Sequence, residues 1–233
     1  MKKQPNAAIA DPIEETALIL RTCDADMTSY GGFRWPAFGP VEAPDWNPAH
    51  VCGGGLHGLL WGEGSAKYLN LSEGAKWIVF RALLSDVAHG TGELVDKCKA
   101  RLGSVEFCGS RNDAIAYLLA HGAVGKMVVF GTATAGDSGT ATAGDSGTAT
   151  AGDCGTATAG DRGTATAGYC GTATAGVGGV ISILRWNGER YKARIALVKD
   201  EDGDGELEPN TPYKLDDKGH FCTDCTARRE GKV

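Results

Sequence analysis

Residues 131–178 read GTATAGDS GTATAGDS GTATAGDC GTATAGDR GTATAGYC GTATAGVG, an eight-residue unit that repeats without a gap. A short fixed period is typical of a fold in which each unit contacts only its neighbours along one axis. In each octad, Thr-Ala-Thr-Ala alternates like a strand with two unlike faces, and the glycines and the aspartate supply a turn. The repeat therefore predicts short strands separated by tight turns.

Two octads are needed to complete one coil, because eight residues are too few to hold two strands and two turns. We predict a flat, two-sided β-solenoid of three 16-residue coils, with parallel strands stacked about 4.8 Å apart. Alanine methyls let the two sheets approach closely, whereas an inward threonine would bury a hydroxyl that needs a partner. Alanines such as Ala133 and Ala135 should therefore point inward, and the threonines should form ladders on both outer faces. These surface-binding candidates are Thr132, Thr134, Thr140, Thr142, Thr148, Thr150, Thr156, Thr158, Thr164, Thr166, Thr172 and Thr174.

The turn residues offer an internal test of the 16-residue coil. Cys154 and Cys170 are separated by one such coil, so they should be stacked neighbours within the Cα range of about 4.4–6.8 Å that a disulfide accepts. Aspartates stacked one coil apart repel each other unless they bond turn amides, meet Arg162 or bind a cation. We favour bonding to turn amides, because the glycine-rich nonapeptide of calcium-binding repeats is absent.

The outward Thr-x-Thr array resembles that of ice-binding β-solenoids, and the octad is similar to the repeats of bacterial ice-nucleation proteins. The resemblance covers 48 of 233 residues and implies that stacked threonines order water on a surface matched to ice. The alternative is a disordered low-complexity linker, because ordering each residue costs about 1–2 kcal/mol and alanine interiors recover little of it. A solenoid of this composition needs a folded seed at one end and a cap at the other.

Composition excludes several classes of partner. The net charge is −6, and no basic cluster exceeds Arg228 with Arg229, which argues against nucleic acid. No apolar run approaches the roughly 18 residues needed to cross a bilayer, which argues against a membrane partner. Residues 1–11 lack the apolar stretch of a secretory signal, so the eight cysteines predict reduced thiols in a cytoplasmic protein.

The sequence divides into a flexible segment (residues 1–15), an α+β domain (16–130), the solenoid (131–178) and a β cap with a tail (179–233). In the α+β domain we expect an ordered loop over the proline-rich residues 30–48. We also expect a helix over 114–120 that starts from a capping box at Ser110. The predicted strands are Thr16–Thr22, Lys76–Leu84, Val105–Cys108 and Met127–Phe130, the last of which should seed the solenoid.

A second unusual stretch, CGGGLHGLLWG, spans residues 52–62. Cys52 and His57 are candidates for a nucleophile and its base, or for metal ligands together with His50. The structural alternative is that the glycines form a turn, His57 bonds a backbone carbonyl, and Leu59, Leu60 and Trp61 fill the core. The run also resembles the central motif of an uncharacterised domain of bacterial and phage proteins, Cys-Gly-x-Gly-Leu-His-Gly, which lies upstream of similar octads. That likeness covers roughly residues 16–130 and implies a shared fold without a known activity.

After the repeat, bulky residues replace the alanines and threonines, as a cap requires. Hairpins should turn at Asn187–Gly188 and at Asp217–Gly219. Two metal motifs are incomplete: the acidic run at 200–204 lacks the glutamate of an EF-hand, and His220, Cys222 and Cys225 lack a fourth zinc ligand. We therefore predict no metal and no cofactor.

These observations predict a mainly β, non-enzymatic repeat protein whose α+β domain seeds a threonine-faced solenoid. Its partner should be ice, ordered water or another copy of itself. The alternative is an enzyme or small-ligand domain around Cys52, Gly53–Gly55 and His57, with the solenoid as a spacer.

Overall fold

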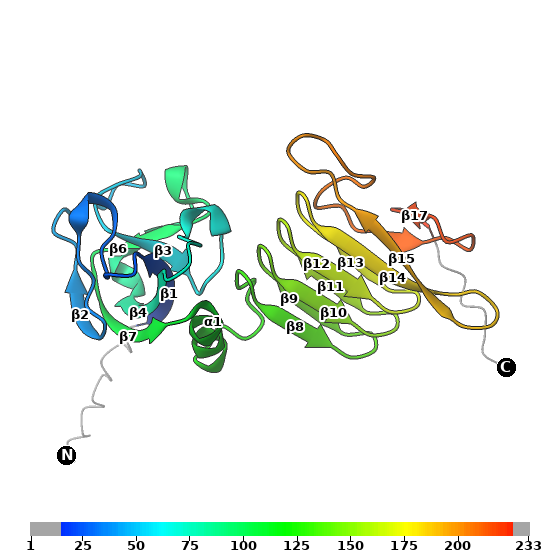
Figure 1. Cartoon of the computed structure of the whole chain (residues 1–233), viewed down its shortest axis with the longest axis horizontal. Helices are drawn as coiled ribbons and strands as arrows, with labels where there is room; N and C mark the ends of the chain where they lie inside the picture. Colours follow the sequence, from blue (N-terminus) through cyan, green and yellow to red (C-terminus); the bar gives the residue numbers. More distant parts are fainter. Residues whose placement is uncertain (1–14, 226–233) are drawn as a thin grey trace, which may run out of the picture.

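The computed structural model describes residues 15–225, so the predicted flexible N-terminus (1–15) and the end of the tail lie outside them, apart from Glu15. The described chain forms an N-terminal unit with one curved sheet and a solenoid beside it (Figure 1). The helix α1 and the loop that follows it lie between the two. Within residues 15–225 no helix is long and apolar enough to cross a membrane.

The N-terminal sheet has seven antiparallel strands in the order β2-β7-β4-β1-β3-β6-β5. Their bounds are β1 Thr16–Cys23, β2 Gly39–Glu42, β3 Leu56–Leu60, β4 Lys76–Leu83, β5 Val87–His89, β6 Cys98–Ala100 and β7 Leu102–Gly109. Short 3-10 turns occupy Tyr30–Gly32, Ala66–Tyr68, Leu84–Asp86 and Gly92–Leu94. The sequence predicted β1 and β4 within one residue at each end, and β7 is longer than predicted.

One prediction for this sheet was wrong, and its strand β3 was not predicted. The proline-rich loop contains the edge strand β2, where Pro40 is tolerated because an edge strand does not need every amide. The glycine-rich run around His57 contains β3, an interior strand between β1 and β6. Gly58 is needed there because a Cβ at this position would lie 2.6 Å from the Leu20 carbonyl oxygen.

The helix α1 (Arg111–Ala120) begins where the capping signal predicted. The Ser110 hydroxyl accepts a hydrogen bond from the Asp113 amide at 3.3 Å. Ala114, Ile115 and Leu118 are buried against residues of β1, β3 and β4. This core fixes the position of the chain that leaves the helix and enters the solenoid.

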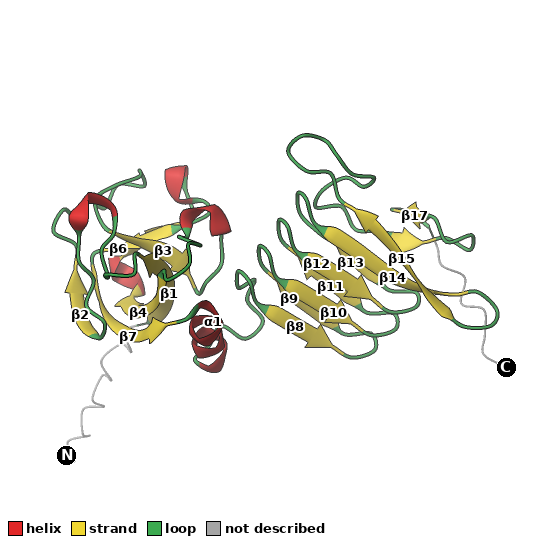
Figure 2. Ribbon diagram, in the orientation of Figure 1, coloured by secondary structure: helices red, strands yellow, loops and turns green. Residues whose placement is uncertain are grey.

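The solenoid has the predicted 16-residue period (Figure 2). One sheet contains β8 (Thr132–Ala135), β10 (Thr148–Ala151) and β12 (Thr164–Ala167), and it continues into β14 (Val180–Trp186) and β15 (Tyr191–Leu197). The other contains β9 (Thr140–Ala143), β11 (Thr156–Ala159) and β13 (Thr172–Thr174). Thr148 lies between Thr132 and Thr164, so threonine stacks on threonine. The alanines from Ala141 to Ala175 are buried between the sheets, as predicted, whereas Ala133 and Ala135 of the first strand are only partly buried.

The aspartates bond turn amides, as predicted. Oδ1 of Asp153 accepts from the amide of Tyr169 on the next coil at 2.9 Å, and Oδ1 of Asp145 accepts from Asp161 at 3.1 Å. The glycine before each turn makes room for this carboxylate, because a Cβ on Gly168 would lie 2.6 Å from Asp153 Oδ1. Arg162 does not neutralise this ladder and instead pairs with Glu201 at 3.9 Å.

The predicted seed strand at Met127–Phe130 was wrong, because only Val128 forms a bridge, with Glu63, and a turn follows. Phe130 adopts φ of 57°, the same left-handed conformation as Ser138 in the first octad. Its amide donates to the Asp145 carbonyl at 2.8 Å, as Ser138 donates to the Asp153 carbonyl. Phe130, eight residues before Ser138, therefore already forms the turn that ends each octad. This turn starts the stack of coils.

Large apolar side chains close the far end of the solenoid. Ile181 and Ile183 of β14 are buried and continue the alanine column, and Leu207, Tyr213 and Leu215 pack against them. β14 and β15 form the first predicted hairpin, although its loop has four residues, Asn187–Arg190, and not two. The Asn187 side chain accepts the amides of Glu189 and Arg190, which favours the longer loop.

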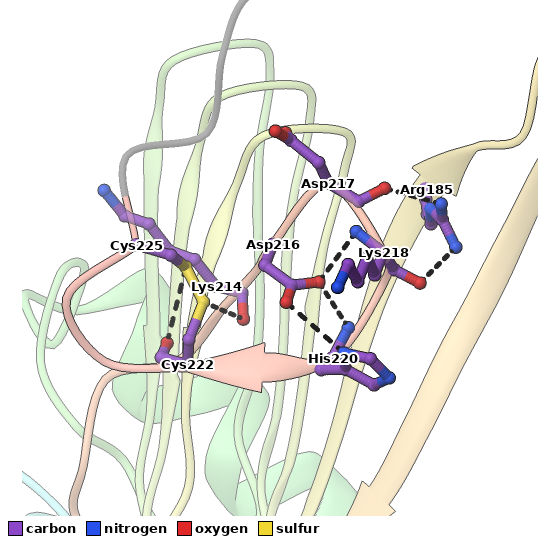
Figure 3. A network of polar contacts seen from close by, with 8 residues as sticks. All are labelled: Arg185, Lys214, Asp216, Asp217, Lys218, His220, Cys222 and Cys225. Atoms are coloured by element: carbon purple, nitrogen blue, oxygen red, sulfur yellow. Dashed lines mark hydrogen bonds and ion pairs between the residues drawn. A yellow bond between two sulfur atoms is a disulfide. The ribbon is translucent and has the colours of Figure 1, made fainter.

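The second hairpin, β16 (Lys214–Leu215) with β17 (Phe221–Cys222), docks on β14 through Arg185. Arg185 donates to the carbonyls of Lys218 and Asp217 at 2.5 and 2.6 Å, and Asp216 accepts the amide of His220 (Figure 3). Cys222 and Cys225 form a disulfide with a Cα separation of 5.8 Å. The prediction of reduced thiols was therefore wrong for this pair.

The aspartate ladder can be tested by replacing one member. We expect Asp153→Ala to lower the free energy of unfolding by about 1 kcal/mol, because the Tyr169 amide loses its acceptor. Asp153→Asn should cost less, since its amide oxygen can still accept. The free energy of unfolding of both variants is measured by urea unfolding, with hydrogen exchange at the solenoid amides as the probe. Equal losses for the two would contradict the role of the carboxylate oxygen.

Candidate functional site

The threonines form two outward lattices. We define face A as the outer side of the sheet containing β8, β10 and β12, and face B as the outer side of the sheet containing β9, β11 and β13. On both faces threonines are exposed or half-buried while the alternating alanines are buried, except on the open first strand. Hydroxyls two residues apart on a strand lie about 6.7 Å apart, and those on stacked coils about 4.8 Å apart. The faces are regular and hold no charged side chain within the strands.

The two faces differ in extent. Face A continues from β12 onto β14 and β15, where Thr164 is followed in register by Val180 and then Leu197. Its five strands span about 19 Å at the usual spacing between strands. Face B ends at β13, where Ala173 forms a bridge with Tyr213 of the cap. Face A is therefore the larger surface, and its last two strands carry apolar side chains.

The structure keeps the Cys52 and His57 side chains from acting as a nucleophile and its base. Nε2 of His57 accepts the Gly53 amide at 3.2 Å, so its lone pair on that nitrogen is occupied. The atom within reach of Cys52 Sγ is Nζ of Lys97, at 3.1 Å. His50, the third candidate ligand, bonds its ring to the Thr91 hydroxyl. The three candidates thus face different partners.

The glycine loop around Cys52 is held by hydrogen bonds from Lys99 and to Glu93. Lys99 of β6 is fully buried, and its Nζ donates to the carbonyls of Val51 and Gly53 at 3.0 and 2.8 Å. The Cys52 amide donates to the Glu93 carboxylate at 2.6 Å. Gly53 has a positive φ of 88°, which a side chain would disfavour. The glycine run was the sequence signal for this loop. The role of Lys99 could not be predicted from it, because Lys99 lies more than 40 residues away in the chain.

His57 is held neutral by its surroundings. Burial, and then the positive charges of Lys97, Arg21 and Lys99, lower its pKa to about 4. Nη1 of Arg21 donates to the His57 carbonyl at 2.7 Å, and its guanidinium lies 4.9 Å from the centre of the Trp35 ring. The ring of His57 thus bonds the backbone of the glycine turn, although its partner is the Gly53 amide and not a carbonyl as predicted.

The incomplete metal motifs have other roles in the structure. Oδ1 of Asp200 accepts the amides of Asp202 and Asp204, at 3.0 and 2.9 Å, and so forms a turn. Nδ1 of His220 lies 3.3 Å from Asp216. Within residues 15–225, no three His, Cys, Asp or Glu side chains converge as they would to hold a metal ion.

The fold and its two threonine faces define a short, threonine-faced β-solenoid, and sequence comparison finds similarity to ice nucleation proteins. An ice nucleation protein of Pseudomonas fluorescens is 35% identical over 104 residues, which is 45% of this chain and 8% of that relative. The ice nucleation protein InaU of Pantoea ananas is 46% identical over 66 residues, 28% of this chain and 6% of the relative. An ice nucleation protein of Pseudomonas syringae is 40% identical over 73 residues, which is 31% of this chain and 6% of that relative.

The chain thus spans less than a tenth of the length of these relatives. No protein-family model matches the chain, and no solved structure matches it. The repeats of this protein are similar to those of ice nucleation proteins, and the described structure fits a non-enzymatic repeat protein.

The neutral His57 predicts a pH dependence of stability. Its pKa is lower in the folded protein than the ordinary value of 6.5, so the unfolded chain binds a proton first as pH falls. Its contribution to stability is therefore complete above about pH 6.5 and is lost between there and about pH 4. We expect urea unfolding to require less denaturant at pH 5 than at pH 7. The difference should shrink in His57→Gln, and an undiminished difference in that variant would assign the effect to other groups.

Proposed function

We propose that this protein binds ice or an ordered layer of water through the threonine lattices of faces A and B. The observation that carries the proposal is the in-register stacking of threonine on threonine over consecutive coils, with the alanines turned inward. Such a surface presents hydroxyls and methyls at two fixed spacings, about 4.8 and 6.7 Å. A disordered or mobile surface could not match a lattice, whereas this one is held by in-register backbone pairing between neighbouring strands.

The similarity to ice nucleation proteins supports the same proposal. Those relatives are far longer than this chain, which covers 8% and 6% of two of them. Three coils offer a small face, and we therefore expect binding to existing ice to exceed nucleation of new ice.

Replacing threonines on each face tests the proposal. We expect Thr150→Lys with Thr166→Lys, on face A, to abolish most thermal hysteresis and inhibition of ice recrystallisation. A lysine side chain projects from the flat face and disrupts the ordered water, and it adds a charge that ice does not accommodate. The equivalent pair on face B, Thr142→Lys with Thr158→Lys, should remove less activity because that face is smaller.

Two controls accompany this experiment. Thr223→Lys places one lysine on an exposed threonine of the cap, outside both faces, and should leave both activities unchanged. Thr150→Val with Thr166→Val keeps the shape and removes only the hydroxyls, so it separates loss of binding from loss of folding, which circular dichroism also monitors. Absence of both activities in the unaltered protein would reject the proposal.

Self-association is a second candidate function, favoured by the exposed apolar residues of the cap strands. Trp186, Tyr191, Ile195 and Leu197 are each exposed by more than 40%, on the same side of β14 and β15. Exposed apolar clusters commonly mark a contact with another protein surface.

A concentration series tests self-association directly. We expect the sedimentation mass to rise with protein concentration, and Ile195→Lys with Leu197→Lys to return the protein to a monomer. Lys192→Glu, on the other side of β15, is the matched control and should leave the mass unchanged. A protein that remains monomeric at every concentration would exclude this function.

A further inference from the structure

Two thiols lie at equivalent positions of consecutive coils. Cys154 and Cys170 occupy the last position of octads three and five, within the turns that follow β10 and β12. These strands are paired in register, with Thr148 opposite Thr164. Equivalent residues of stacked coils lie about 4.8 Å apart, which is inside the Cα range of about 4.4–6.8 Å that a disulfide requires.

Two hydrogen bonds beside this pair hold the two turns one coil apart. The Cys154 amide donates to the carbonyl of Tyr169, the residue before Cys170, at 2.7 Å. The Tyr169 amide in turn donates to the carboxylate of Asp153, the residue before Cys154, at 2.9 Å. Both cysteines have a φ of 57°, so their side chains leave the backbone in the same direction. Parallel Cα–Cβ bonds leave the two Cβ atoms about 4.8 Å apart, slightly more than the roughly 3.5–4.5 Å of a disulfide. A bond between the two sulfurs therefore needs side-chain rotation and a small approach of the two turns.

We propose that Cys154 and Cys170 are a thiol-oxidation site, at which a low-molecular-weight disulfide such as glutathione disulfide forms a bond between two coils. Cys154 is exposed and Cys170 half-buried, so Cys154 reacts first. Its thiolate attacks one sulfur of the glutathione disulfide, forms a mixed disulfide and releases one glutathione thiolate. The Cys170 thiolate then attacks the Cys154 sulfur and releases the second glutathione. Two protons leave the protein thiols, both cysteines are oxidised and one disulfide is reduced.

The other thiols of the described chain are poorly placed to compete. Cys23 and Cys98 are buried, and burial raises their pKa to about 11 and about 12. Cys108 is half-buried, burial raises its pKa, and its sulfur lies 3.7 Å from Sδ of Met27. Cys52 is exposed but lies in the N-terminal unit, where its sulfur contacts Lys97. Cys222 and Cys225 are already joined to each other. Oxidation of the full chain should therefore produce one new intramolecular bond, within the solenoid.

Trypsin provides a direct readout, because Arg162 lies between the two cysteines. The full chain carrying Cys52→Ser is equilibrated in a glutathione redox buffer, its remaining thiols are alkylated, and it is unfolded and digested. We expect mass spectrometry to find peptide 127–162 joined to peptide 163–185, at a yield that does not change when the protein is diluted. The oxidised protein should also melt a few degrees higher than the reduced protein, because the bond closes a loop of one coil.

The matched control moves one thiol to the opposite edge of the solenoid. In Cys154→Ser with Ser146→Cys, the two thiols follow β9 and β12, which belong to different sheets. They still lie in different tryptic peptides, and we expect glutathione adducts without a linked peptide pair. Cys154→Ser alone should show no change in melting on oxidation. Stable glutathione adducts on Cys154 in the parent chain, linkage only between molecules, or equal linkage in the opposite-edge control would each overturn the proposal.

Discussion

The hydrogen bonds that join each coil to the next hold the solenoid together. An alanine methyl buries little apolar surface, so a core built from alanines supplies far less stabilisation than a core of leucine or isoleucine. The parallel ladders pair every strand in register, and each aspartate carboxylate adds a bond from one turn to the turn above it. Because these bonds need identical backbone geometry in every coil, the sequence repeats with almost no variation outside one or two turn positions.

A stack held in this way requires both ends to be closed by larger groups. At the first end, Phe130 takes the turn conformation of the octad and packs its ring at 5.8 Å from that of Trp77. Asp145 joins the two units twice, since its carbonyl accepts the Phe130 amide and its carboxylate accepts the Ala66 amide. At the other end, Ile181 and Ile183 replace the alanines and bring conventional hydrophobic burial. The N-terminal unit thus positions the first coil, and the cap prevents the last one from fraying.

The regularity that stabilises the solenoid also produces its surface. Stacking identical coils produces a face whose side chains repeat at the spacing of the backbone. Such a face forms without a pocket. The N-terminal unit is different, since its conspicuous loop is built on buried Lys99 and neutral His57 and serves to order the chain. The part of the molecule with the most unusual chemistry is therefore structural, and the chemically plain part carries the candidate site.

By itself, the sequence determined the architecture of the repeat: the 16-residue coil, alanine inside, threonine outside, aspartate on turn amides and bulky residues in the cap. These features are local, because each depends on residues within one or two octads. Tertiary structure alone decided the order of the N-terminal strands, the strand hidden in the glycine run and the conversion of the expected seed strand into a turn at Phe130. It also decided that Lys97, and not His57, faces Cys52. Such outcomes depend on contacts between residues far apart in the chain, so no local pattern of residue types could specify them.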